Sequence, residues 1–202
     1  MSTLEIIGGK RSIEAVVPAG VTPVGYGFEV RRALPMPGLD RLGPFILLDH
    51  MGPFPVQAGA RAGFPEHPHA GIETLTYLLE GGMSHRDSIG NASVMGPGEA
   101  QWMRAGRGIL HEENPSLELR RDGGTLTGIQ FWLDLPPEHK REAPAYRQIG
   151  RDEIIEVAVE GGRVRVITGQ MAGVTGPLQT LGNPLLAHVR LEPGRAVTLG
   201  VD

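Results

Sequence analysis

The stretch HPHAGIETLTYLLEGG, residues 67–82, places two histidines around a proline at the start of an apolar run. His67 and His69 are two residues apart, and side chains with this spacing point to the same face of a β-strand. The run that follows, residues 72–80, is rich in β-branched, aromatic and large apolar residues, which are typical of strands. The sequence therefore predicts a strand entry that presents two imidazoles on one face.

A second pair of polar side chains has the same spacing. His111 and Glu113 lie in GILHEE (108–113), about forty residues after His69. If both segments are strands, each offers two groups to one face, and imidazole nitrogen with carboxylate oxygen suits a divalent transition metal. The chain has no cysteine, which excludes thiolate ligands and disulfides. The two pairs together predict a four-ligand metal site.

Glu73 is a second carboxylate near the first pair. It lies four residues after His69, so it points to the same face if the strand stays regular through Ala70 and Gly71. A bulge at Gly71 would reverse that direction. From spacing alone, either Glu73 or Glu113 is the fourth ligand, and the other is a partner that orients an imidazole.

The rest of the chain repeats one pattern, in which short β-rich runs are separated by glycine and proline. Several of these runs alternate apolar and polar residues, the period of a half-buried strand. No long helical period is present; at most a turn or two is expected near 151–156. Regularly spaced short strands predict an all-β sandwich or barrel. The runs cover residues 25–34, 44–50, 72–80, 91–96, 99–104, 108–113 and 125–135.

A domain boundary is expected in residues 134–150, which are rich in proline and charge. Beyond it, residues 154–170 predict a hairpin that turns at Gly161 and Gly162, and residues 185–202 predict two further strands around a turn at 192–194. We therefore expect a metal-binding barrel over 1–136 and a shorter segment over 145–202. A segment of that length is short for a complete second barrel, because small domains bury proportionally little surface.

The composition and the charge of the chain argue against some classes of function. The 202 residues carry a net charge of −4, so no attraction to nucleic acid is expected. No apolar run approaches the roughly 20 residues of a membrane span, and the first residues lack the pattern of a secretion signal. A soluble, cytoplasmic protein with no membrane association is expected.

The remaining histidines and the aromatic residues are expected to have structural roles. His85 stands beside Arg86 and Asp87 on a polar hairpin, so solvent exposure is predicted for it. His139 and His188 are expected to be structural or solvated. Three aromatic residues are expected mainly to pack in the core: Trp102, Phe131 and Trp132.

The motifs resemble those of a known family. HPHAGIETLTYLLEGGMSHRDSIGN (67–91) and GPGEAQWMRAGRGILHEENP (96–115), with PFILLDHMGP (44–53) and GIQFWLDLP (128–136), resemble the pirin family of the cupin superfamily. The resemblance covers about residues 24–136 and continues more weakly beyond. It implies a bicupin of two stacked β-barrels (the double-stranded β-helix or jelly roll), here with a short or incomplete C-terminal cupin.

The resemblance also implies a ligand set. The three histidines and one glutamate of the family's iron site correspond to His67, His69, His111 and Glu113. In cupins more generally the glutamate of the first motif is a ligand, which would be Glu73 here. The resemblance favours Glu113, and Glu73 stays as the alternative ligand or as an orienting partner. It implies iron(II) first, with zinc, manganese, copper or nickel as alternatives.

Two functions follow from the resemblance. The first is a quercetin 2,3-dioxygenase-type oxidoreductase that opens flavonol-like aromatic substrates with dioxygen. In such an enzyme we expect Glu113, or Glu73 if it is not a ligand, to accept the proton of the substrate hydroxyl. The alternative is an iron-dependent regulatory protein that binds a transcription factor or a metabolic enzyme without turnover. The complete set of site residues favours the enzyme.

Overall fold

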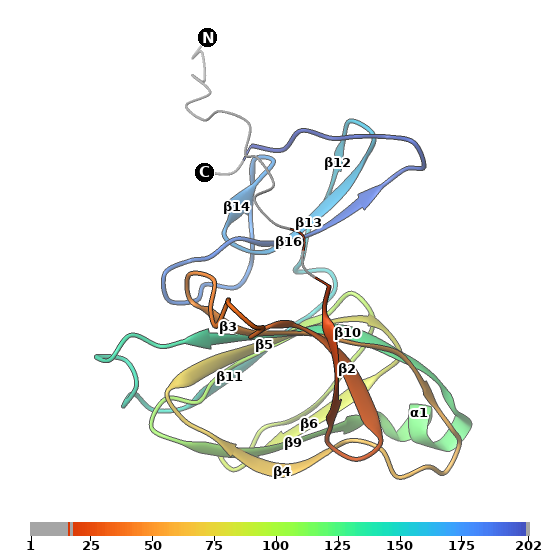
Figure 1. Ribbon diagram of the computed structural model, residues 1–202, viewed down its shortest axis with the longest axis vertical. Coiled ribbons are helices and arrows are strands. Elements are labelled where there is room, and N and C mark those ends of the chain that lie inside the picture. The colour runs from red at the N-terminus through yellow and green to blue at the C-terminus, as the bar shows by residue number, and fades with distance from the viewer. Residues whose placement is uncertain (1–15, 17, 201–202) are drawn as a thin grey trace.

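The computed structural model describes residue 16 and residues 18–200 (Figure 1). Within this part of the chain it is built almost entirely of strands, with one short helix, α1 (Leu117–Asp122). The predicted all-β class is confirmed. The strands are β1 (Gly20–Val24), β2 (Phe28–Leu34), β3 (Phe45–Val56), β4 (Phe64–His69), β5 (Ile72–Glu80), β6 (Met83–Asp87), β7 (Ala92–Met95), β8 (Ala100–Arg104), β9 (Ile109–Pro115), β10 (Gly124–Asp134), β11 (Ala145–Ile149), β12 (Glu156–Val159), β13 (Gly162–Thr168), β14 (Gln170–Met171), β15 (Val174–Thr175) and β16 (Leu186–Leu191).

Two antiparallel sheets form a barrel. One has seven strands in the order β1-β2-β3-β10-β5-β8-β11, and the other has four in the order β4-β9-β6-β7. Figure 1 shows the four-stranded sheet below the seven-stranded one. Both segments that carry the predicted ligands, β4 and β9, are neighbours in the smaller sheet.

An apolar core joins the two sheets. Val30, Met51 and Leu78 come from the larger sheet, while Met83 and Met95 come from the smaller one, and all five belong to one buried cluster. Each such side chain, fully buried, stabilises the fold by roughly 1.5–3 kcal/mol. This cluster holds the sheets together and so fixes the distance across the barrel.

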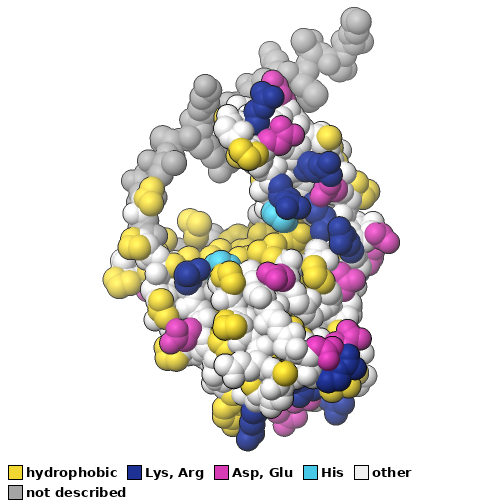
Figure 2. Space-filling model, turned by 90° about the vertical axis from the view of Figure 1, so that its right-hand side faces the viewer, with side chains coloured by type: hydrophobic (Ala, Val, Ile, Leu, Met, Phe, Trp, Pro, Cys, Tyr) yellow, Lys and Arg dark blue, Asp and Glu magenta, His cyan; other side chains and the backbone are white. Residues whose placement is uncertain are grey.

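The seven-stranded sheet is buried on its outer face as well. Leu75 and Tyr77 of β5 pack in a second cluster with Ile154 and Ile167 from the C-terminal segment. Burial on both faces explains why residues 73–78 of β5 are all buried. Figure 2 shows apolar side chains gathered where the C-terminal segment meets the barrel.

The C-terminal segment forms a three-stranded sheet, β12-β13-β16, and a two-stranded one, β14-β15. The predicted hairpin is confirmed, with Gly161 at a φ of 76° in its turn. Only one of the two strands expected over 185–202 is present among the described residues, namely β16. Residues 145–149 form β11, which pairs with β8 at the edge of the barrel sheet.

Helix α1 was not expected from the sequence. It begins after Ser116, whose hydroxyl accepts a hydrogen bond from the backbone N–H of Leu119. The turn of helix expected near 151–156 is absent: residues 151–153 form a turn, and β12 begins at Glu156. Over the described residues, no helix has the length and apolar character needed to cross a membrane. The expectations for the first fifteen residues lie outside this part of the chain.

Candidate metal centre

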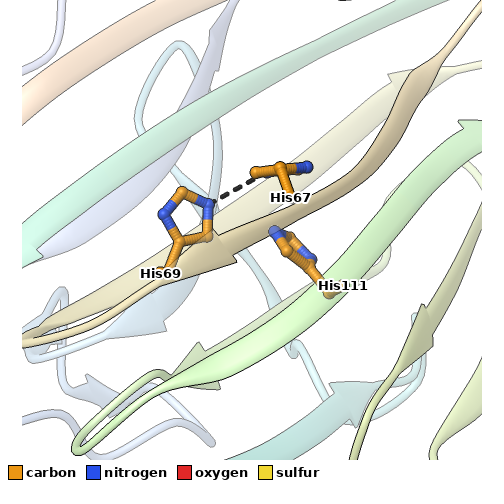
Figure 3. Close-up of side chains that lie close together, drawn as sticks. All are labelled: His67, His69 and His111. Atoms are coloured by element: carbon orange, nitrogen blue, oxygen red, sulfur yellow. Dashed lines mark hydrogen bonds between the residues drawn. The ribbon is translucent and has the colours of Figure 1, made fainter.

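Strand register gathers three histidines at one point. In the β4–β9 pair, His67 lies directly opposite His111, and His69 follows two residues later on the same face. The ring centroids of the three imidazoles are 4.4–4.9 Å apart. Figure 3 shows the three rings converging from the two strands. The spacing that predicted a shared face therefore brings these side chains together.

Hydrogen bonding fixes which nitrogen of His67 keeps its lone pair. Its Nδ1 lies 2.8 Å from the carbonyl oxygen of Pro65 and can donate to it, which leaves Nε2 with its lone pair. That Nε2 lies 3.1 Å from Nε2 of His69 (Figure 3). Two nitrogens bound to one ion at typical zinc–nitrogen distances would be about 3.0–3.4 Å apart. The pair is thus spaced like two ligands of one metal.

His69 and His111 are held in the neutral form that binds metals. Burial, with the neighbouring His67 and His85 adding to the shift, lowers the pKa of His111 to about 3. Burial also lowers the pKa of His69 to about 4, with His111 and His67 adding to the shift. At neutral pH both imidazoles therefore keep the lone pair that a metal requires.

These shifts predict acid sensitivity of the metal-free protein. The pKa values of His69 and His111 lie below the ordinary 6.5, so the unfolded chain takes up protons first as the pH falls. The free energy of unfolding should fall between pH 6.5 and about 4, by up to about 1.4 kcal/mol per pH unit for each histidine. Urea denaturation in EDTA at pH 7 and pH 5 measures this fall in the free energy of unfolding.

Two variants serve as controls for this prediction. A His69→Asn/His111→Asn variant should lose less stability between pH 7 and pH 5 than the parent, and His139→Ala should lose as much as the parent. Equal stability of the parent at both pH values would contradict the pKa shifts.

His111 has the environment of a metal ligand. It is 2% exposed, and neither of its ring nitrogens has a hydrogen-bond partner among the described residues. A buried polar group without a partner costs roughly 1–3 kcal/mol. A bound ion would satisfy one of these nitrogens, so the residues present are suited to a metal.

Glu113 lies two residues from His111 and is held by two amides that sequence reasoning missed. The side-chain amides of Gln101, on β8, and Gln130, on β10, each donate to one oxygen of its carboxylate. The Gln130 contact is 3.1 Å. Two such donors fix the orientation of the carboxylate. The alternation of side chains along β8 and β10 could have indicated that Gln101 and Gln130 point inward. It could not indicate that they contact Glu113 across the barrel.

His85 is not exposed, which corrects the expectation for it. It is 3% exposed and faces the barrel interior, because it alternates in phase with Met83 and Asp87 on β6. Its Nε2 lies 3.1 Å from Oδ2 of Asp87, and its ring stacks on Tyr146 at a centroid distance of 4.2 Å. The charged residues around His85 suggested a solvated hairpin, but of these only Arg86 is exposed, whereas Asp87 is buried with His85. Ligand atoms of His85, His111 and Glu113 lie within 4.8 Å of one another.

Glu73 is placed apart from these groups. In the sheet register, Glu73 of β5 lies opposite Arg104 of β8 and Leu133 of β10, and its side chain is on the same outer face as that of Leu75. Thr76 points to the opposite, inner face, where its hydroxyl oxygen lies 3.4 Å from the side-chain amide nitrogen of Gln130. Gly71 has a φ of 72° and ends the extended strand between His69 and Glu73. Of the two alternatives left open by the spacing, the structure has the one in which the strand is interrupted at Gly71. Glu73 is 1% exposed, and burial raises its pKa.

Trp132 is the aromatic residue beside the histidines. Its ring lies edge-on to His69 with centroids 4.8 Å apart. Phe131 is buried in the outer apolar cluster, and Trp102 packs against that cluster. Core packing is thus confirmed for these two, whereas Trp132 forms part of the wall around the candidate site.

A barrel of two facing antiparallel sheets with inward histidines on neighbouring strands defines a cupin-type protein. Solved structures with the same fold include a quercetin 2,3-dioxygenase from Acinetobacter baumannii, with a TM-score of 0.75 and 35% identity over 81% of this chain and 58% of that one. The chain belongs to the pirin family, whose model matches residues 27–133. The resemblance expected from the motifs is confirmed.

Relatives extend the comparison beyond the barrel. Human pirin is 37% identical over 93% of this chain and 62% of its own length. A bacterial pirin from Escherichia coli, solved in complex with nickel(II), has a TM-score of 0.55 and 25% identity, over 76% of this chain and 71% of that one. This chain spans less than two thirds of human pirin and of the dioxygenase chain.

Proposed function

We propose that His67, His69, His111 and Glu113 bind one divalent transition metal, iron(II) first, in an oxygenase of the quercetin 2,3-dioxygenase type. The observation that carries the proposal is the cluster of three imidazoles around His111, whose buried nitrogens have no other partner among the described residues. Three neutral imidazoles and one carboxylate would leave a divalent ion with a net charge near +1. Relatives that include a quercetin 2,3-dioxygenase and a nickel-bound pirin support this assignment.

A bound ion would lower the pKa of a substrate hydroxyl and couple an electron-rich flavonol to dioxygen. The chain's own residues then have separate roles. His67 and His69 are half-buried, so substrate approaches on their side of the cluster, where Trp132 offers an aromatic wall. Each oxygen of Glu113 already accepts one amide hydrogen, but a carboxylate oxygen has a second lone pair. Glu113 can therefore accept the hydroxyl proton while Gln101 and Gln130 hold it in place.

We further propose a division of the chain that follows the sheets. Because β11 completes the edge of the seven-stranded sheet, the metal-binding barrel extends from the expected 1–136 to Ile149. Residues from 154 onward form a cupin-like C-terminal unit that packs on the outer face of β5 through the cluster around Leu75 and Tyr77. In this arrangement the C-terminal unit covers the outer face of the seven-stranded sheet, and the interior histidines all belong to the barrel.

The test is flavonol turnover at known metal content. The purified chain is stripped of metal, reconstituted with iron(II), and mixed with quercetin while the absorbance of the flavonol and the oxygen concentration are recorded. We expect loss of flavonol with matching oxygen uptake, and none under anaerobic conditions. His139→Ala, which removes a surface imidazole, should behave like the parent.

Full metal occupancy without turnover of any flavonol would overturn the enzymatic proposal. That outcome would favour the alternative function, a metal-dependent regulatory protein that binds a protein partner. Failure to bind any divalent ion would overturn the metal centre itself. The two failures are distinguished by measuring the metal content of the same sample.

A further inference from the structure

A tyrosine outside the proposed ligand set connects the two sheets of the barrel. Tyr146 lies on β11, the edge strand of the seven-stranded sheet, and Ser93 lies on β7, the edge strand of the four-stranded one. The hydroxyl oxygens of Tyr146 and Ser93 are 2.6 Å apart. The side-chain amide of Gln148, also on β11, donates to the carbonyl oxygen of Val94 at 2.9 Å. Side chains of β11 therefore close the barrel where the two edge strands meet.

Tyr146 also contacts the residue that holds Glu113. Gln101 lies on the neighbouring strand β8 and points to the same inner face, because Tyr146 pairs with Met103, two residues further along β8. The hydroxyl of Tyr146 donates to Oε1 of Gln101 at 3.3 Å, while Nε2 of the same amide donates to the Glu113 carboxylate. One side-chain amide thus joins Tyr146 to a proposed metal ligand.

The three hydrogen bonds have a consistent direction. A tyrosine hydroxyl has one hydrogen, so when Tyr146 donates to Gln101 it accepts from the hydroxyl of Ser93. The Gln101 oxygen then receives the tyrosine proton, and its amide nitrogen faces Glu113. The reverse orientation would place the amide oxygen against the carboxylate, and two acceptors without a hydrogen between them repel. Gln101, which is 4% exposed, is therefore held in one orientation from both ends.

The ring of Tyr146 is held independently of its hydroxyl. It stacks on His85 at a centroid distance of 4.2 Å and an interplanar angle of 14°. It also packs against the buried cluster of Met103, Ala105 and Ile109. Phenylalanine at this position would keep these contacts and remove only the hydrogen bonds of the hydroxyl. The role of the hydroxyl can therefore be separated from the packing of the ring.

We propose that Tyr146 is a positioning residue of the metal centre: its hydroxyl fixes the Gln101 amide, and this amide holds Glu113 in the orientation that binds the ion. The inference rests on the metal binding by Glu113 proposed above, but not on flavonol turnover. It gives β11 a part in the metal centre as well as in closing the barrel.

The test compares Tyr146→Phe with the parent. The metal-stripped chain is titrated with cobalt(II) and followed by calorimetry and by the visible absorption of the bound ion. Loss of a residue that orients a metal ligand typically weakens metal binding roughly 10–100-fold, and we expect about tenfold here because Gln130 still holds the other carboxylate oxygen. The visible spectrum of bound cobalt(II) should shift as well, because the orientation of Glu113 changes.

Tyr77→Phe is the matched control. It also removes a hydroxyl from a tyrosine of the seven-stranded sheet, but that hydroxyl contacts Arg165 and His188 of the C-terminal segment. Tyr77→Phe should therefore bind cobalt(II) like the parent, even if it lowers the stability of the fold. Circular dichroism establishes that each variant is folded.

Two further variants separate the path through Gln101 from closure of the barrel. In a Gln101→Met background, adding Tyr146→Phe should change the cobalt(II) affinity by less than about twofold, because the connecting amide is already absent. Gln148→Met removes the other contact between β11 and β7 without touching Gln101, and it should leave the affinity unchanged. A loss in Gln148→Met as large as that in Tyr146→Phe would assign the effect to closure of the barrel and overturn the positioning role.

A second readout requires no metal. In the metal-free chain labelled with ¹⁵N, Tyr146→Phe should shift the side-chain amide resonances of Gln101, and Tyr77→Phe should not. The inference is overturned if these resonances do not change, if Tyr146→Phe binds cobalt(II) as tightly as the parent, or if its loss is the same in the Gln101→Met background. Absence of cobalt(II) binding to the parent would overturn the metal centre and the inference with it, whereas metal binding without flavonol turnover would overturn only the enzymatic proposal.

Discussion

Replacement of His111 by alanine is expected to abolish metal binding completely. In the described chain, His111 belongs both to the group of ligand atoms with His67 and His69 and to the group with His85 and Glu113, so neither group keeps three ligand atoms after its loss. Loss of His67 or His69 leaves the group that contains His85 intact, and loss of His85 leaves the group that contains His67 and His69. The measurement is the metal content after reconstitution and dialysis, together with the thermal midpoint with and without added metal.

The thermal measurement gives this prediction a second readout. A metal present at about 1,000 times its dissociation constant stabilises the folded state by about 4 kcal/mol, so the parent should unfold at a higher temperature when loaded. His111→Ala should show no such shift, while His50→Ala, at a half-buried site on β3, should keep it. One tightly held equivalent in His111→Ala would rule out both groups as the metal site.

Replacement of Arg165 by methionine should destabilise the C-terminal unit strongly. Arg165 is 9% exposed and donates to the carbonyl oxygens of Arg151 and Ile154 and to the hydroxyl of Tyr77 on the barrel. Methionine fills part of the space but leaves these acceptors without donors. Hydrogen bonds to charged groups contribute about 1.5–3 kcal/mol, so we expect a total loss of roughly 2–5 kcal/mol in the free energy of unfolding.

Arg163 supplies a matched control on the same strand. Its side chain is exposed and pairs with Glu156 at the surface, so Arg163→Met should change stability by less than about 1 kcal/mol. Urea denaturation measures both variants, and hydrogen exchange locates the change. Equal, small effects of the two substitutions would show that the buried arginine does not hold the unit to the barrel.

Much of the fold was predictable because strand period and turn residues are local properties. The alternation in residues 99–104 and 125–135 marks β8 and β10, and Gly161 with Gly162 marks the C-terminal hairpin. Helix α1 was missed because six residues are too few for a helical period to be visible. Its start depends instead on one capping hydroxyl, that of Ser116.

The candidate site was predictable only in part. The spacing of His67 with His69 places two imidazoles on one face, and the structure brings His111 to them. Gln101 and Gln130 were missed because they reach Glu113 from two strands of the opposite sheet. His85 was missed because its polar neighbours in sequence concealed its inward direction. In each case the contact depends on which strands are neighbours.

The sequence alone determined which faces the side chains share, since the β-strand period holds wherever the chain is extended. It could not decide between Glu73 and Glu113. That choice depends on Gly71, whose positive φ interrupts the strand after His69, so that Glu73 lies on the outer face of β5. Glu113 stays on the extended β9, two residues after His111 and opposite His85 of β6, because the register of the neighbouring strands sets its place. Register arises from packing between sheets, which only the tertiary structure contains.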